Sequence, residues 1–165
     1  MAAAPCATLR ALVNRGEARR MKAVVRWQDK VCFEVESGSG HKLLIDGPPD
    51  HGGENRGPRP MELMLMGVGS CSSFDVVHIL KKARQQVTDC RCELSAKRAE
   101  NEVPAVFTEI HLHFVVTGVD LKEAQVEKAV ALAVDKYCSA ATMLVRGGVI
   151  ITHVYAVEQA GTENG

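Results

Sequence analysis

Two of the six cysteines in the sequence, Cys71 and Cys138, occur where predicted helices meet small residues, a setting in which a thiol can do redox chemistry. The reactive form of cysteine is the thiolate. Because a free thiol has a pKa of about 8.5, a site must lower that pKa with positive charge or a helix N-terminus. Cys138 directly precedes a predicted short helix at residues 139–146, whose N-terminus could do so. By residue type alone, a buried structural thiol is the alternative for both.

The charged neighbours of Cys71 on its predicted helix have opposite effects on a thiolate. Asp75, one turn later, opposes ionisation of the thiol, whereas a protonated His78 or an arginine from elsewhere in the chain favours it. A glutamate near the start of the same helix is a further charged neighbour. The candidate charge partners of Cys71 are therefore Asp75, His78, Arg26, Arg59 and Glu62.

Other cysteines and histidines carry weaker chemical signals. Cys90 and Cys92 share the apolar side of a predicted strand, where a thiol behaves as a small hydrophobic side chain. Such a Cys-x-Cys pair could bind a metal ion, as could His111 and His113 on the next strand. A structural zinc site needs a second pair of ligands, however, and the sequence offers none beside either pair. We therefore expect no metal ion and no bound cofactor.

A helix predicted at residues 60–84 must position Cys71. Pro60 suits its first position, where the missing N–H is not needed, and Lys81 and Lys82 suit its last turn, where cations meet the negative end of the helix dipole. Before Asp75 the helix has almost no polar face. This composition predicts that other elements enclose the helix on most sides.

Two glycines in the middle of this helix, Gly67 and Gly69, each cost about 1 kcal/mol relative to alanine. A helix keeps such residues where something must approach it closely. We therefore expect the backbone of a second helix to pack there, leaving the nearby thiol of Cys71 shielded but reachable.

Alternating and helical spacing of apolar residues predicts the remaining elements. The predicted strands are residues 23–27, 31–35, 41–46, 87–97, 106–117 and 149–157, and the later helices are residues 121–137 and 139–146. The order β-β-β-α-β-β-α-β predicts an α+β fold in which antiparallel sheets pack around central helices.

Length and charge bound the class of protein. The 165 residues suit one domain at residues 21–160, preceded by an arginine-rich extension at residues 1–20, either disordered or a start-site artefact, and followed by a tail at residues 161–165. The formal charge of zero suggests neither a nucleic acid nor a membrane surface as partner. The longest apolar run, residues 63–68, is far below the roughly 18 residues that cross a bilayer. Without a secretory signal, the cytoplasm is the expected location.

Several of these residues together resemble the signature of the OsmC/Ohr family of thiol-dependent peroxidases. Pro60 is followed by Glu62 and then, eleven residues after the proline, by Cys71, and Cys138 follows Lys-Tyr at the end of a predicted helix. The element order of residues 21–158 is also similar to that of the family. Two short segments are similar to the YhfA-like branch of the family. They are Phe74-Asp75-Val76-Val77, which begins three residues after Cys71, and Lys136-Tyr137-Cys138-Ser139.

The resemblance implies an intertwined homodimer with central helices and two active sites at the interface. It implies that Cys71 reduces an organic hydroperoxide and becomes a sulfenic acid, and that Cys138 then closes a disulfide. An external dithiol or lipoyl-type reductant would reset the pair. An apolar lining of Met64, Leu65 and Val68 would favour small, lipid-like hydroperoxides.

Two positions depart from the family pattern. Peroxidases of the family have a glutamate directly after the helix-opening proline, where this chain has Met61, and an arginine on an N-terminal strand that stabilises the thiolate. The predicted strand at residues 41–46 contains no arginine, so Arg26, Arg56 and Arg59 are the substitutes. The alternative function is therefore a redox-responsive or ligand-binding dimer without fast turnover, and a purely structural member is the third hypothesis.

Overall fold

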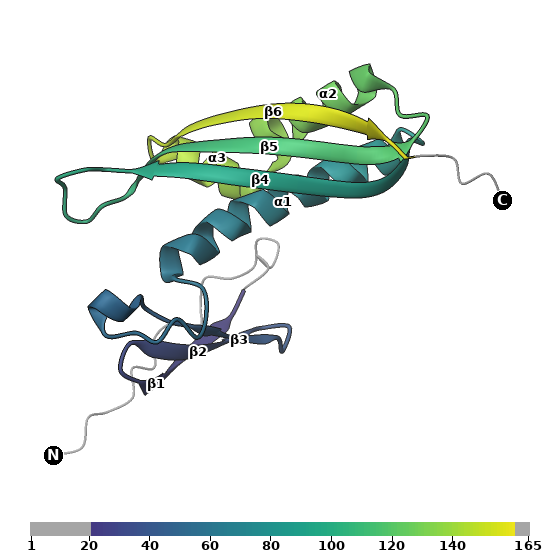
Figure 1. The fold of residues 1–165 in the computed structure, drawn as a ribbon. Coiled ribbons are helices and arrows are strands. Elements are labelled where there is room, and N and C mark those ends of the chain that lie inside the picture. Colours follow the sequence, from purple (N-terminus) through teal and green to yellow (C-terminus); the bar gives the residue numbers. More distant parts are fainter. Residues whose placement is uncertain (1–20, 161–165) are drawn as a thin grey trace, which may run out of the picture. The chain divides into compact units, whose positions relative to one another are not determined.

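The computed structural model describes residues 21–160; the predicted extension at residues 1–20 and the tail at residues 161–165 lie outside the described residues. The chain divides into two compact units, one ending at Arg59 and one beginning at Pro60, and each is described by itself (Figure 1). The first contains a three-stranded sheet, and the second contains another three-stranded sheet with helices. Cys71 and Cys138 both belong to the second unit.

The N-terminal unit is an antiparallel sheet in the order β1-β2-β3. Its strands are β1 (Ala23–Asp29), β2 (Cys32–Ser37) and β3 (Lys42–Ile45), and a 3-10 turn, η1 (Pro49–His51), follows. All three predicted strands are confirmed within two residues, because β-branched runs separated by polar turns identify a hairpin reliably. Cys32 is fully buried, whereas the side chains of β1 are exposed.

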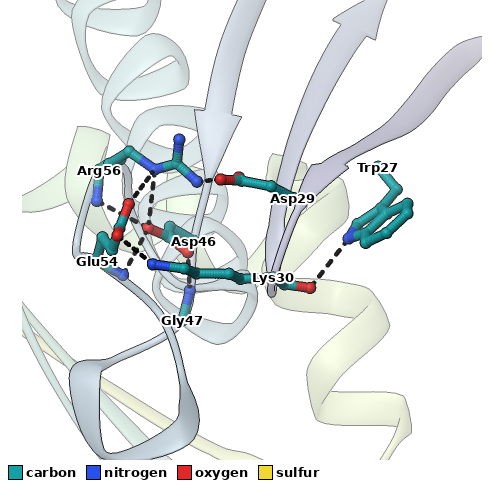
Figure 2. A network of polar contacts seen from close by, with 7 residues as sticks. All are labelled: Trp27, Asp29, Lys30, Asp46, Gly47, Glu54 and Arg56. Carbon is teal, nitrogen blue, oxygen red and sulfur yellow. Dashed lines mark hydrogen bonds and ion pairs between the residues drawn. The ribbon is translucent and has the colours of Figure 1, made fainter.

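A buried carboxylate orders the loop that follows β3. Asp46 is 1% exposed, and its side chain accepts hydrogen bonds from the backbone N–H groups of Gly47, Glu54 and Arg56 at 2.8, 3.0 and 3.0 Å (Figure 2). The bond from Arg56 is the largest of the causes that lower the pKa of Asp46. The Arg56 side chain also pairs with Asp29. Loop backbone that lacks sheet partners thus finds its hydrogen bonds here.

The C-terminal unit packs helices on one face of a mixed sheet (Figure 1). Its elements are α1 (Pro60–Lys82), β4 (Gln86–Arg98), β5 (Phe107–Val119), α2 (Glu123–Leu132), a π-helical turn η2 (Ala133–Tyr137), α3 (Ser139–Arg146) and β6 (Ile150–Gln159). β4 and β5 pair antiparallel as predicted, but β6 runs parallel to β5. The expectation of antiparallel pairing fails at β6 because the chain crosses over through α2 and α3 before returning to the sheet.

One hydrophobic core lies between this sheet and the helices. Its buried side chains include Ile110, Leu112, Phe114 and Val116 from β5, Val68, Val76 and Leu80 from α1, and Val126, Ala129 and Val130 from α2. Fully burying a side chain of this size contributes about 1.5–3 kcal/mol. The core therefore fixes α1, which carries Cys71, and α2, which leads through η2 to Cys138, against the sheet.

The end of α1 differs from the prediction. The helix ends at Lys82, two residues early, because Arg84 has a φ of 57° in the left-handed region. The N–H of Gln85 then donates to the carbonyl of Leu80 at 3.0 Å, which satisfies an orphaned helix carbonyl. The two lysines still occupy the last turn as predicted.

Within the C-terminal unit, only one face of α1 is covered. Met64, Met66 and Phe74 are 49, 47 and 71% exposed, so the expectation that other elements enclose the helix on most sides is wrong for the chain alone. By length and composition α1 could span a membrane, a test that core helices of soluble proteins also pass.

The two glycines of α1 have different environments. A Cβ on Gly69 would lie 2.6 Å from a methyl carbon of Leu94 on β4, whereas a Cβ on Gly67 would meet nothing within 4 Å. The predicted close approach is therefore confirmed at Gly69 alone, and the approaching group is a strand side chain instead of a helix backbone.

Candidate redox site

A change of helix type positions Cys138. α2 passes into the π-helical turn η2, in which the N–H of Cys138 donates to the carbonyl of Ala133, five residues earlier, at 2.8 Å. Cys138 itself is extended, with φ −66° and ψ 107°, and α3 begins at the next residue. The single predicted helix at residues 121–137 thus contains a π turn, a feature frequent at functional sites.

The sulfur of Cys138 caps the N-terminus of α3. Its Sγ accepts a hydrogen bond from the N–H of Ala141 at 3.4 Å, and the thiol donates to the carbonyl of Val68 on α1 at 3.9 Å. The side chain is fully buried. The predicted helix N-terminus beside this thiol is confirmed, and the sulfur joins α3 to α1.

Burial dominates the ionisation of Cys138. Desolvation raises its pKa above the ordinary value of a thiol, and the hydroxyl of Ser72 and the N–H of Ala141 lower it in part. Cys71 raises the pKa further, through a hydrogen bond and through its charge. Cys138 is therefore a protonated thiol at neutral pH.

These interactions bring the two predicted cysteines together. Cys71 is half-buried on α1 and packs against the core, close enough to Cys138 for each thiol to act on the other. All five cysteines of the described residues are free. A reagent from solvent therefore reaches Cys71, and Cys138 lies within reach of Cys71.

Ser72 is a further residue of this site, which no sequence motif indicated. Its side chain is fully buried, and it follows Val68 by four residues and precedes Val76 by four on the same face of α1. Sequence spacing alone does not single it out, because a helix that is apolar on almost every side gives no clear signal for its inner face.

The charged residues predicted to assist Cys71 occupy three different settings on α1. Asp75 is half-buried one turn after Cys71. His78 is exposed and stacks on Phe74, with ring centroids 6.0 Å apart. Glu62 is exposed in the first turn, where a negative charge suits the helix dipole.

The arginines proposed as substitutes belong to the N-terminal unit. Arg26 is exposed and pairs with Glu36, its Nη1 lying 3.1 Å from the carboxylate Oε2. Arg56 pairs with Asp29 and Asp46. Arg59 is exposed at the end of the unit. Arg26 and Arg56 therefore serve carboxylates of their own unit.

Cys90 and Cys92 are core thiols, as their alternation along β4 predicts. Desolvation is the main cause that raises the pKa of each to about 11. The charge of Cys90 also raises the pKa of Cys92, and the hydroxyl of Ser73 on α1 partly offsets these effects. Both thiols stay protonated and unreactive at neutral pH.

The histidines of β5 have protein partners. His111 lies 2.7 Å from the hydroxyl of Thr152, and His113 lies 3.5 Å from a carboxylate oxygen of Glu93. Among residues 21–160, no group of three or more His, Cys, Asp and Glu side chains is placed to hold a metal ion.

A groove follows the exposed face of α1, and Cys71 is not among its lining residues. Its lining consists of Ser70, Ser73, Phe74, Val77, His78 and Lys81. The predicted lining residue Val68 is instead 2% exposed and belongs to the core, while Met64 is exposed and Leu65 is partly buried. Val68 contributes to the site through its backbone carbonyl.

Comparison with known proteins assigns this fold to a family. Residues 52–154 match the family model described as OsmC-like protein, which is more than half of the chain. The chain belongs to the OsmC-like family. It is similar to Protein YhfA of Escherichia coli strain K12, with 49% identity over 140 residues, which are 85% of this chain and 100% of that protein.

Solved structures share the fold. A hypothetical protein from Aquifex aeolicus VF5 is 30% identical with a TM-score of 0.75, covering 87% of this chain and 100% of that one. A Legionella pneumophila protein described as the organic hydroperoxide resistance protein OsmC is 22% identical with a TM-score of 0.63, covering 84% of this chain and 97% of that one. OhrB of Bacillus subtilis, an organic hydroperoxide resistance protein, is 21% identical with a TM-score of 0.57, covering 83 and 98%.

Proposed function

We propose that this chain is a thiol peroxidase that reduces organic hydroperoxides through Cys71 and Cys138. The observation that carries the proposal is the contact between a half-buried thiol on α1 and a fully buried thiol at the N-terminus of α3. Proteins of the same fold from Legionella pneumophila and Bacillus subtilis are described as organic hydroperoxide resistance proteins, which supports organic hydroperoxides as the substrate class.

Cys71 is the attacking residue in this proposal because it is the more accessible of the two thiols. Its thiolate attacks one oxygen of the hydroperoxide, the O–O bond breaks, and the other oxygen leaves as an alkoxide that takes up a proton and becomes the alcohol. Cys71 becomes a sulfenic acid, the first step of cysteine oxidation.

Cys138 then resolves the sulfenic acid. Its thiol loses a proton, the sulfur attacks the sulfur of Cys71, and hydroxide leaves with that proton as water, so that a disulfide remains. The N–H of Ala141 and the N-terminus of α3 stabilise the transient thiolate. An external dithiol or lipoyl-type reductant supplies the two electrons that restore both thiols.

The surface of α1 supports two further parts of the proposal. The groove on the exposed face of α1 includes the exposed apolar ring of Phe74, which suits a small hydrophobic hydroperoxide. Met64 and Met66 extend this apolar surface, and a second copy of the chain covering it would make a homodimer. Light scattering tests the dimer: twice the chain mass supports it, and the mass of one chain contradicts it.

Intact mass measurement tests the chemistry. One equivalent of cumene hydroperoxide should remove about two hydrogens from the protein as a disulfide forms. Cys71→Ser should abolish the change in mass. Cys138→Ser should leave a stable sulfenic acid on Cys71, so that the protein gains the mass of one oxygen. An unchanged mass of the natural protein after long exposure would contradict the proposal.

A redox-responsive or ligand-binding dimer is the second candidate function. It is favoured by Met61 at the position of the family glutamate and by the engagement of Arg26 and Arg56 with carboxylates. Without a positive charge beside Cys71, oxidation of its thiol would be slow. Oxidation of Cys71 without dithiol-dependent turnover would support this candidate over the peroxidase.

A further inference from the structure

The hydroxyl of Ser72 is buried and unpaired. The residue is 0% exposed, and among residues 21–160 its Oγ has no partner at hydrogen-bond geometry. Buried polar groups in native proteins are almost always hydrogen-bonded, so an unpaired one needs an explanation. Val68 and Val76 flank it on the same helix face, and an apolar residue between them would avoid the loss of hydration.

This hydroxyl lies beside the sulfur of Cys138. The Cys138 thiol donates to the carbonyl of Val68, one helical turn before Ser72, at 3.9 Å. The Ser72 hydroxyl is close enough to the sulfur to lower its pKa. Ala141 donates to the same sulfur from α3 at 3.4 Å. The sulfur thus has a fixed donor on one side and a rotatable hydroxyl on the other.

We infer that Ser72 is a positioning residue for the resolving step, and that its hydroxyl donates a hydrogen bond to Cys138 once that thiol ionises to attack Cys71. This inference rests on the function proposed above. In the resting thiol, the S–H uses the Val68 carbonyl, so no donor is required from α1. The thiolate can only accept, and a carbonyl cannot serve it, whereas a hydroxyl rotates to do so.

The bond balance of the step explains when the hydroxyl acts. The proton of Cys138 leaves with the hydroxide of the Cys71 sulfenic acid as water, and one S–S bond replaces one S–O bond. The negative charge rests on a sulfur that has no exposed surface, where water cannot solvate it. A preorganised donor is therefore worth most during this step.

The adjacent serine provides a matched control. Ser73 follows Ser72 on α1, but its hydroxyl lies beside Cys92 on β4, a thiol whose pKa is about 11. Ser73→Ala removes the same atom from the same helix without touching Cys138. A general effect of serine loss on α1 would appear in both variants.

Rapid mixing with one equivalent of cumene hydroperoxide, followed by dimedone trapping and mass measurement, gives the formation and decay rates of the Cys71 sulfenic acid separately. In Ser72→Ala the decay should slow roughly tenfold relative to formation, as expected for a lost hydrogen bond to a charged group. The pH midpoint of the decay should rise. Ser73→Ala should leave the decay rate unchanged, whatever its effect on formation through the α1 groove that Ser73 lines, and Ser72→Thr should restore the decay.

Thermal unfolding separates this role from a structural one. Because the Ser72 hydroxyl is unpaired, Ser72→Ala should leave the Tm equal or higher. A lower Tm with unchanged sulfenic acid decay would overturn the inference and leave the proposed function intact. Absence of any Cys71 sulfenic acid in the natural protein would overturn both.

Discussion

The C-terminal unit contains two pairs of thiols, and adjacent serines of α1 lie beside them. Cys71 and Cys138 join two helices, and the second of these sulfurs receives an N–H from the start of α3. Cys90 and Cys92 lie two residues apart on β4, where desolvation is the main cause that raises the pKa of each to about 11 and the charges of Asp89 and Glu93 add to it. Burial keeps the thiols of both buried settings protonated, and Cys138 differs from the strand pair in its backbone donor and in the second thiol within its reach.

The largest expected contrast is in turnover. Cys71→Ser should reduce dithiol-dependent consumption of cumene hydroperoxide by about 10³-fold or more, because it removes the nucleophile. Cys92→Ser should retain the activity, because that thiol lies on the strand and stays protonated. Equal loss in the two variants would remove the distinction between the pairs.

Alkylation should show the inertness of the strand pair. With pKa values of about 11, Cys90 and Cys92 have little thiolate at pH 8. Iodoacetamide should label them about 10²-fold more slowly than a free thiol of ordinary pKa. Time-resolved peptide mass measurement gives these rates, and labelling as fast as that of glutathione would contradict the burial argument.

Alkaline pH should destabilise the protein through the same pair. Well below the ordinary thiol pKa of about 8.5, both thiols are protonated in the folded and unfolded states, so they add no pH dependence. Between about pH 8.5 and pH 11 the unfolded state ionises first, and the free energy of unfolding falls by about 1 kcal/mol per thiol, a figure reduced for partial exposure. Urea unfolding at several pH values should show a smaller fall in the free energy of unfolding for the double variant Cys90→Ala, Cys92→Ala than for the natural protein. An identical fall would contradict the prediction.

The smallest expected effect is on stability, and it depends on which face of α1 meets β4. Gly69→Ala would press against Leu94 and should destabilise the protein by about 1 kcal/mol, the overpacking outweighing the gain in helix propensity. Gly67→Ala meets open space in the chain and should stabilise it by about 0.5–1 kcal/mol. Thermal unfolding measures both, and shifts of the same sign would contradict the packing.

Local chemistry made much of the fold and the site predictable. Pro60 at the start of α1, the alternation of β4 and β5, and the start of α3 after Cys138 are all set by residues near each other in the chain. The pairing of Cys71 with Cys138 followed from resemblance to a family, since no local pattern relates two residues that far apart.

Long-range packing decided the features that were missed. The parallel pairing of β6 depends on the path through α2 and α3, and the π turn before Cys138 depends on how the chain reaches α1. The burial of Val68 and Ser72 depends on which face of an almost uniformly apolar helix meets the core. Such a helix gives a weak periodic signal, so its inner face could not be chosen from sequence.

Disulfide mapping after oxidation tests the central contrast most directly. The protein is treated with one equivalent of cumene hydroperoxide, its free thiols are blocked, and it is digested without reduction for mass measurement. Linked peptides should contain Cys71 and Cys138, while Cys90 and Cys92 should carry the blocking group. A bond through either strand thiol, or no bond at all, would contradict the account.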